Sequence, residues 1–295
     1  MRAVFLAILV ISILVACESR MPGPPVLVYA TGEAGSELDL LLANFSSETD
    51  VPVAVVWGDS AENTNRLLNN VDDSVDVIIT TNVADIWRAA DEGVLRPIKP
   101  ETLENVAAIL RDSDGLWAAL EMRIHVIAMA GGQVRPLVAS YDELAGEMLR
   151  GRVCLSSSEL HINRSLIAML INERGAKQTE RLVRLWMQNL AAAPFPSQDA
   201  LIAAMREGLC DYGILEWWPN EDDLMYFKPQ PTTMDIDGIG VARHAQHPES
   251  AQRLVAWLLS KKSIRLIGDF DASSVGIAGW RDEDARLLAE RAGYR

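Results

Sequence analysis

The sequence predicts an α/β protein of two lobes. Short β-rich runs alternate with amphipathic helical stretches, the alternation occurs in two separate sets, and two further extended runs lie where they can cross between the sets. Strands that alternate with helices are typical of parallel, doubly wound sheets with helices on their faces. The 295 residues suffice for two modest domains. We therefore expect a ligand site in a cleft at the carboxyl ends of the strands.

The first set opens the globular part of the chain. Its expected elements are strands at 26–29, 53–57 and 75–79 and a helical segment at 36–45. Asp59 and Glu62 have the spacing of a capping box at the start of a helix after the second strand, and Asn82 and Asp85 repeat that spacing after the third. Strand, turn and helix thus recur three times.

The second set follows a long extended run at 122–129. Its expected elements are a strand at 152–155, a helix to about 171 capped by Ser156, Ser157 and Ser158, a helix at 180–190, a helix at 200–207 capped by Ser197, and a strand at 211–216. The runs at 122–129 and 235–241 are the two candidate crossing strands.

The N-terminus predicts export. Arg2 precedes an apolar run at 3–15, which is too short to span a bilayer and ends at Leu14-Val15-Ala16-Cys17. That ending resembles the bacterial lipobox, in which the cysteine is lipidated. We expect a lipoprotein signal peptide at 1–16, then a lipidated Cys17 and a linker to residue 25, which tether the protein to a membrane at the periplasm or cell surface. The alternatives are an uncleaved membrane anchor or a cysteine that stands at this position by chance.

The net charge limits the classes of binding partner, and the cysteines bear on a disulfide in an oxidising compartment. A formal charge of −14 argues against a nucleic acid or an anionic membrane surface as partner. With Cys17 in the lipobox, Cys154 and Cys210 remain, and an oxidising compartment favours a disulfide between them over two buried thiols.

Catalytic and metal-binding motifs are absent from the sequence. It has no G-x-S-x-G, H-E-x-x-H, P-loop or dinucleotide fingerprint, and its histidines lack metal-type spacing. Ser156 to Ser158 near His161 fit capping better than hydrolysis. We expect neither an enzyme nor a metal or cofactor.

A series of short segments resembles the ferric-iron-binding branch of extracytoplasmic solute-binding proteins, which serve ABC importers. In order, these segments are Val28-Tyr29, Val75-Asp76-Val77, Ile86-Trp87-Arg88-Ala89, Gly93-Val94-Leu95-Arg96-Pro97, Leu110-Arg111-Asp112, Gly115-Leu116-Trp117, Arg123 with Val126-Ile127, Tyr141-Asp142-Glu143-Leu144-Ala145, Gly151-Arg152-Val153, Gly238-Ile239-Gly240-Val241 and His247-Pro248-Glu249-Ser250-Ala251. Their order and spacing carry the resemblance.

The resemblance implies a type II periplasmic-binding-protein fold, with a mixed, mainly parallel sheet in each lobe and a central cleft. Lobe 1 is expected at 26–122 plus about 237–268, and lobe 2 at 123–236 plus about 269–295. A small-molecule ligand, an ABC permease as partner and a monomeric state are implied as well.

The iron chemistry of that family does not carry over. Its adjacent tyrosines fall at Trp217 and Trp218, and an indole offers no lone pair suited to a hard cation. The family's histidine falls at about Glu33, and its acidic position at Thr81 or Asn82. We therefore expect binding of iron by a tyrosine pair to be lost.

Arg123 and the tryptophans are the leading ligand candidates. The resemblance makes Arg123 an anion-facing arginine, which with the serine turn could clamp a carboxylate or phosphate; the alternative is an interlobe salt bridge. Trp217 and Trp218 either face the cleft or seal the core. His125 is interpreted as a structural histidine. The full set of candidate ligand residues is Thr31, Glu33, Asp59, Ser60, Thr81, Asn82, Arg123, Ser156, Ser157, Ser158, Ser197, Glu216, Trp217 and Trp218.

Two functions from different classes follow. The first is a lipid-anchored solute receptor for an ABC importer, which binds an anion or a small organic molecule. The second is a protein that keeps the fold, has lost transport, and acts as a sensor or partner of a membrane protein. Loss of the tyrosine pair motivates the second hypothesis.

Overall fold

The structure is a computed structural model that describes residues 23–70, 74–131, 137–216, 224–230, 232–262 and 274–295. Three predicted functional residues, Cys17, Trp217 and Trp218, lie outside these ranges. No helix among the described residues has the length and apolar character needed to cross a membrane.

The described residues form one continuous path of paired strands in the order β2-β1-β3-β9-β5-β7-β6, with β4 paired to β9 and β8 paired to β5. The strands are β1 (Val26–Thr31), β2 (Val53–Gly58), β3 (Val77–Thr80), β4 (Leu95–Arg96), β5 (Trp117–Ala130), β6 (Val153–Cys154), β7 (Tyr212–Glu216), β8 (Leu224–Phe227) and β9 (Met234–Ala242). The helices are α1 (Glu37–Thr49), α2 (Ser60–Leu68), α3 (Val83–Asp91), α4 (Pro100–Leu103), α5 (His161–Arg174), α6 (Ala176–Asn189), α7 (Gln198–Arg206), α8 (Pro248–Lys261), α9 (Ser274–Trp280) and α10 (Asp282–Ala292), with short 3-10 turns at Ala108–Leu110, Glu143–Ala145 and Glu147–Leu149.

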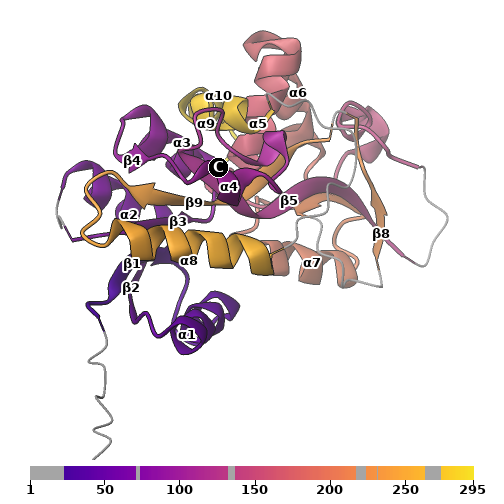
Figure 1. The fold of residues 1–295 in the computed structure, drawn as a ribbon. Helices are drawn as coiled ribbons and strands as arrows, with labels where there is room; N and C mark the ends of the chain where they lie inside the picture. The colour runs from indigo at the N-terminus through magenta and orange to yellow at the C-terminus, as the bar shows by residue number, and fades with distance from the viewer. Residues whose placement is uncertain (1–22, 71–73, 132–136, 217–223, 231, 263–273) are drawn as a thin grey trace, which may run out of the picture.

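The long strand β5 joins the two ends of this path (Figure 1). Its first part pairs antiparallel with β9, from Trp117 opposite Gly240 to Ile124 opposite Met234. Its last part pairs with β7 and β8. The predicted crossing runs at 122–129 and 235–241 are thus parts of β5 and β9, which are longer than expected.

Helices cover both faces of each end of the path. At the β1–β3 end, Tyr29 and Ile78 belong to a core cluster shared with α2, α3 and α9. Their neighbours Val28 and Ile79 point to the other face, where α1 and α8 pack (Figure 1). At the β6–β7 end, α5, α6 and α10 cover one face, and α7 packs near the other. The expected alternation of strands and helices therefore produces layered α/β packing.

The expectation of mainly parallel sheets is wrong. Parallel pairing is limited to β1 with β2, β1 with β3 and β6 with β7, whereas β9 and β5 form antiparallel pairs with all their neighbours. The reason is that the two crossing strands enter the middle of the path and run against the strands on either side.

Most predicted helix starts are confirmed. Asp59, Asn82 and Ser197 each accept hydrogen bonds from backbone N–H groups in the first turn of α2, α3 and α7. The expected cap by Ser156 to Ser158 is wrong, because α5 begins only at His161 and has no side-chain cap. The helix expected at 180–190 begins earlier, at Ala176.

A buried hydrogen-bond chain fixes β5 against α5. His125 is fully buried, and its Nε2 lies 2.8 Å from the carbonyl of Ile162. A carbonyl only accepts, so Nε2 carries the proton and Nδ1 accepts from the Thr233 hydroxyl at 2.6 Å. Thr233 in turn accepts from the Tyr141 hydroxyl at 3.0 Å. The chain agrees with a structural role for His125.

We expect the buried hydrogen bonds of His125 to make the stability of the folded protein decrease at acidic pH. Burial lowers the pKa of His125 from 6.5 to about 4, so the unfolded chain binds a proton that the folded protein excludes. The stabilising contribution of neutral His125 is complete above pH 6.5 and is lost as the pH falls toward 4, by about 3 kcal/mol. Denaturant unfolding between pH 8 and pH 4 should show a steeper loss for the wild type than for His125→Gln. Parallel curves would contradict the assignment.

The predicted disulfide is present. Cys154 in β6 is bonded to Cys210, 56 residues later, just before β7. The bond reinforces the parallel pairing of β6 with β7, in which Cys154 lies opposite Gly213.

Loss of this bond should destabilise the protein markedly. Cross-linking residues 56 positions apart restricts the unfolded chain and contributes roughly 4 kcal/mol by the chain-entropy relation. The Cys154→Ala/Cys210→Ala double variant should therefore unfold at lower denaturant than the oxidised wild type, and match the reduced wild type. Both cysteines should resist alkylation before reduction; ready labelling of the untreated protein would refute the bond.

Candidate functional site

Four charged side chains share one face of the crossing strands. Glu121 and Arg123 alternate along β5, and Asp235 and Asp237 alternate along β9. The register places Glu121 opposite Asp237 and Arg123 opposite Asp235. Directly opposed residues of an antiparallel pair point to the same side, so these four residues form what we call the charged face.

Arg123 is at the centre of the charged face. Its Nη2 lies 2.8 Å from Asp237 Oδ1, and its Nε lies 3.8 Å from Glu216 Oε2 at the end of β7. The guanidinium also donates to the carbonyl of Thr81, in the turn between β3 and α3. Arg123 therefore links the β1–β3 end of the path to the β6–β7 end.

Asp235 ties the charged face to helix α3. The residue is fully buried, and its Oδ1 accepts hydrogen bonds from the backbone N–H of Val83, the first residue of α3, and from Ile236, both at 2.8 Å. A carboxylate at a helix N-terminus is favoured by the helix dipole. Its Oδ2 is buried and accepts no hydrogen bond from the described residues.

Helix α3 approaches the same strand very closely. A Cβ on Gly238, the residue after Asp237, would lie 2.6 Å from Ile86 Cγ2. Only glycine fits between β9 and α3 at this point.

Burial and mutual repulsion perturb the protonation of the carboxylates. Burial raises the pKa of Asp237 to about 7 although Arg123 acts in the opposite direction. Burial raises the pKa of Asp235 and of Glu216 as well, again against the effect of Arg123. Burial alone would lower the pKa of Arg123, but the carboxylates, Asp237 first, raise it. The arginine thus stays charged, and several carboxylates share its single positive charge.

Lys262 supplies a second positive charge at the edge of the charged face, next to Glu121. Its Nζ lies 3.8 Å from Glu121 Oε2 but only 2.8 Å from Glu37 Oε1 in α1. The lysine is therefore shared and neutralises Glu121 only in part.

The predicted ligand residues at the β1–β3 end separate into exposed and internal groups. Glu33 and Asp59 are exposed, and Thr31 and Thr81 are half-buried. Ser60 and Asn82 are buried, and the Asn82 amide is used internally, with Nδ2 bonded to Ser60 and Asp85 and Oδ1 to the Asp85 N–H. Thr81 is the member of this group that contacts Arg123.

The predicted serine clamp is not assembled as expected. Ser156 and Ser158 are buried and bonded to Asn163 and to the carbonyl of Tyr294. Ser157 is half-buried and accepts from the Glu159 N–H. Ser197 is exposed as the cap of α7. Of the candidate residues that the structure describes, Thr81 and Glu216 contact Arg123, and Asn82 contacts Ser60.

Sequence reasoning missed Glu121, Asp235 and Asp237. A signal was available, since each crossing run carries charges at alternate positions within otherwise apolar sequence, Glu121-x-Arg123 and Asp235-x-Asp237. Residues two positions apart in a strand point to the same face, so each of these charged pairs lies on one face of its strand. The register that opposes the two pairs was not accessible from the sequence.

Most of the tyrosine side chains lie in the core. Four of the five, Tyr29, Tyr141, Tyr212 and Tyr294, are buried with at most 2% exposure, and Tyr226 lies half-buried on β8. Within the described ranges, no three His, Cys, Asp or Glu side chains are grouped so that they could hold a metal ion.

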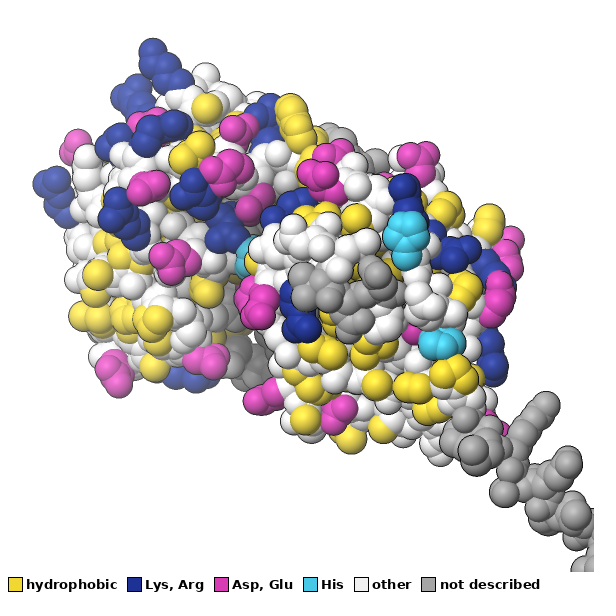
Figure 2. All heavy atoms as spheres, turned by 90° about the vertical axis from the view of Figure 1, so that its left-hand side faces the viewer, with side chains coloured by type: hydrophobic (Ala, Val, Ile, Leu, Met, Phe, Trp, Pro, Cys, Tyr) yellow, Lys and Arg dark blue, Asp and Glu magenta, His cyan; other side chains and the backbone are white. Residues whose placement is uncertain are grey.

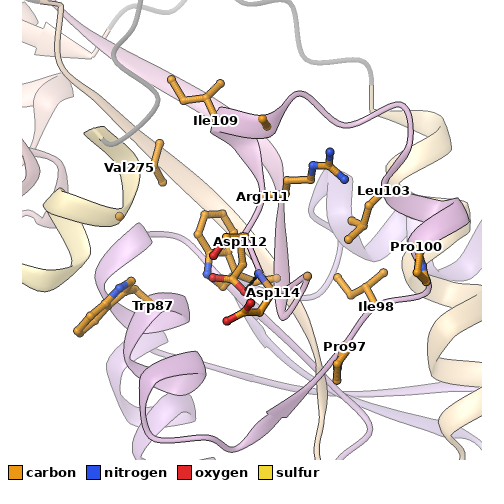
Figure 3. A pocket seen from close by; sticks show the side chains of 15 residues that line it. Trp87, Pro97, Ile98, Pro100, Leu103, Ile109, Arg111, Asp112, Asp114 and Val275 are labelled. Carbon is orange, nitrogen blue, oxygen red and sulfur yellow. Dashed lines mark hydrogen bonds between the residues drawn. The ribbon is translucent and has the colours of Figure 1, made fainter.

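A separate pocket of about 670 Å³ lies beside the start of β5 (Figure 3). Trp87, Leu103 and Val275 form part of its apolar wall. The Asp112 carboxylate is occupied by its own turn, since Oδ2 accepts from the N–H groups of Asp114 and Leu116. None of the candidate ligand residues that the structure describes lines this pocket.

Positive and negative side chains are mixed on the face of the molecule shown in Figure 2. On the face shown in Figure 2, Lys and Arg side chains gather at the upper left but are interspersed with carboxylates. No continuous basic stripe crosses this face.

Comparison with known proteins assigns the family. The family described as bacterial extracellular solute-binding protein matches residues 26–269. The chain belongs to this family. A curated relative, iron uptake protein A1 of Synechocystis, is 30% identical over 242 residues, which cover 75% of this chain and 67% of the relative. Iron uptake protein A2 of the same organism is 25% identical, with 62% of its length covered, so the chain spans about two thirds of these relatives.

Solved structures agree with the fold of this solute-binding protein. A Trichodesmium protein in complex with iron and citrate has a TM-score of 0.79 and 25% identity, covering 92% of this chain and 100% of that one. The ferric binding protein of Campylobacter jejuni has the same TM-score and coverage at 17% identity. The resemblance to the ferric-iron-binding branch is confirmed, as are a mixed α/β fold, a place outside the cytoplasm and the expectation of no enzymatic activity.

The raised pKa of Asp237 predicts a stability effect of opposite sign to that of His125. Folded Asp237 holds its proton to about pH 7, whereas the unfolded chain releases it near 3.8, so the contribution of Asp237 to stability is lost as the pH rises through that window. The free energy of unfolding of Asp237→Asn, relative to wild type, should increase by up to about 4 kcal/mol between pH 4 and pH 8. Asp211→Asn removes a carboxylate beside Arg152 at the other end of β7 and serves as control. A constant difference across this range would argue against a perturbed Asp237.

Proposed function

We propose that this protein is a lipid-anchored receptor that delivers a small solute to an ABC permease. Membership of the extracellular solute-binding family supports the role in import. The anchor is supported by Leu14-Val15-Ala16-Cys17 after the apolar run, which places lipid on Cys17. The receptor works as a monomer at the periplasmic or cell-surface side of the membrane.

In this proposal the receptor consists of two lobes that close on the solute. Lobe 1 comprises 26–122 and about 237–268, and lobe 2 comprises 123–236 and about 269–295. The strand order supports this division, since β1 to β4 pair with each other or with β9, and β6 to β8 pair with each other or with β5. The crossing strands β5 and β9 then absorb the hinge motion.

The observation that carries the proposal is the placement of Arg123. It lies on a crossing strand, is mostly buried with 16% of its side chain exposed, and contacts both Thr81 from the first strand group and Glu216 from the second. The contacts that a charged group makes at this position depend on whether the two lobes are open or closed. The solute binds beside it, with Trp217 and Trp218 following Glu216 in the chain.

The solute is a small organic molecule rather than ferric iron held by tyrosines. The relatives are named for iron, but this chain has Trp217-Trp218 at the position of the tyrosine pair, and its own tyrosines are largely buried. Of the two ligands expected, an anion or a small organic molecule, the second fits better, because carboxylates already surround Arg123.

A second function is favoured by one observation, the loss of the tyrosine pair. A protein that keeps the fold but no longer delivers a cargo would act as a sensor or interaction partner of a membrane protein.

Native mass spectrometry of the freshly purified mature protein tests the receptor function. We expect a retained organic molecule, released on denaturation, and weaker retention by Trp217→Ala and Trp218→Ala. Titration with ferric citrate should give no phenolate-to-iron absorption band, because no tyrosine pair is available. Stoichiometric iron uptake with that band would overturn the proposed ligand. An empty protein with no thermal shift across a solute panel would overturn the receptor function and favour the sensor.

A further inference from the structure

We propose that the solute bears a positively charged nitrogen group, an ammonium or guanidinium, that binds at the carboxylates of the charged face. This inference rests on the proposed receptor function and specifies its ligand class. It replaces the expectation of an anion held by Arg123.

The first argument is the excess of negative charge. Glu216 and the three carboxylates of the charged face surround a single guanidinium. Lys262, a further cation near the charged face, is closer to Glu37 than to Glu121. Like charges in a partly buried site repel strongly because water screens them little. The site therefore lacks positive charge, which a cationic ligand supplies.

The second argument is the strand register. Glu121 lies opposite Asp237, and like charges directly opposed across an antiparallel pair are destabilising. Both side chains keep partial exposure, 33% for Glu121 and 22% for Asp237, so a ligand from solvent can reach them. A cation between these carboxylates converts a repulsive pair into an attractive triplet.

The third argument is an unused acceptor. Asp235 lies opposite Arg123 on the charged face, is fully buried, and has one carboxylate oxygen without a hydrogen-bond donor among the described residues. Buried carboxylate oxygens are costly when unpaired. Asp235 thus places a buried carboxylate with a free acceptor oxygen beneath Asp237 and Glu121, where it favours an ammonium or guanidinium over an anion.

An anion faces the opposite situation. It has to displace Asp237 from its 2.8 Å contact with Arg123 and then lie among the freed carboxylate, Glu216 and Asp235. A metal ion fits poorly as well, since the described residues contain no group of three His, Cys, Asp or Glu side chains that could hold one. An organic cation requires neither displacement nor a closed ligand shell, because its N–H groups donate to carboxylates already in place.

Calorimetric titration of the mature protein tests the inference. The cationic probes are L-arginine, putrescine and choline, and the anionic probes are citrate, malate and phosphate. We expect at least one cationic probe to bind, and Asp237→Asn to weaken it at least tenfold. Asp211→Asn, which removes a similar arginine-paired carboxylate at the far end of β7, should leave the affinity within twofold.

Proton release gives an independent readout. Asp237 is protonated in part of the molecules near neutral pH, so a cation that binds there should expel the proton, and affinity should rise from pH 6 to pH 8. A purely structural role for Asp237 would not produce this dependence.

The outcomes separate this inference from the receptor function. Binding of anions in place of cations, retention of a neutral or anionic molecule by the purified protein, or an unchanged affinity for the cation in Asp237→Asn overturns the inference and leaves a solute receptor. Absence of any bound or retained molecule overturns both.

Discussion

The antiparallel pairing of β5 with β9 is the constraint on which the rest of the molecule depends. It joins the strands that follow the N-terminus to those of the middle of the chain, and it sets the register of the charged face. A slip of β5 by one residue against β9 would place Arg123 on the opposite face of the sheet from Asp235 and Asp237. Register therefore determines at once the architecture and the chemistry of the site.

The buried polar groups around this pairing serve to hold it in place. Asp235 reaches the start of α3, and His125 reaches the start of α5. The two helices that flank the crossing strands are thus each attached to them by a side chain that has no solvent contact. Buried polar networks of this kind favour one arrangement over its alternatives because an unpaired group is costly. The site is positioned by these attachments rather than by its loops.

Local patterns in the sequence predicted much of the fold and less of the site. Alternating strands and helices, the caps at Asp59, Asn82 and Ser197 and the Cys154–Cys210 bond follow from short-range chemistry, and the structure contains them. Strand direction did not follow, because parallel and antiparallel strands look alike in a buried run. The partner of Arg123 on β9 was missed because the pairing depends on the register of the two strands. Asp237 is 114 positions away along the chain, and only the register brings the two together.

Gly238 and Asp237 place a helix-packing contact and the proposed solute contact on neighbouring positions of β9. Helix α3 is seated on the bare backbone of β9 at this glycine, whereas the adjacent Asp237 points to the charged face. Structural and recognition roles therefore fall on neighbouring positions of one strand. At the proposed site, exchange of Asp237 for a neutral or basic residue alters which solutes are attracted. The packing of α3 against Gly238 is retained. Such a separation allows one scaffold to diversify among nutrients by single substitutions.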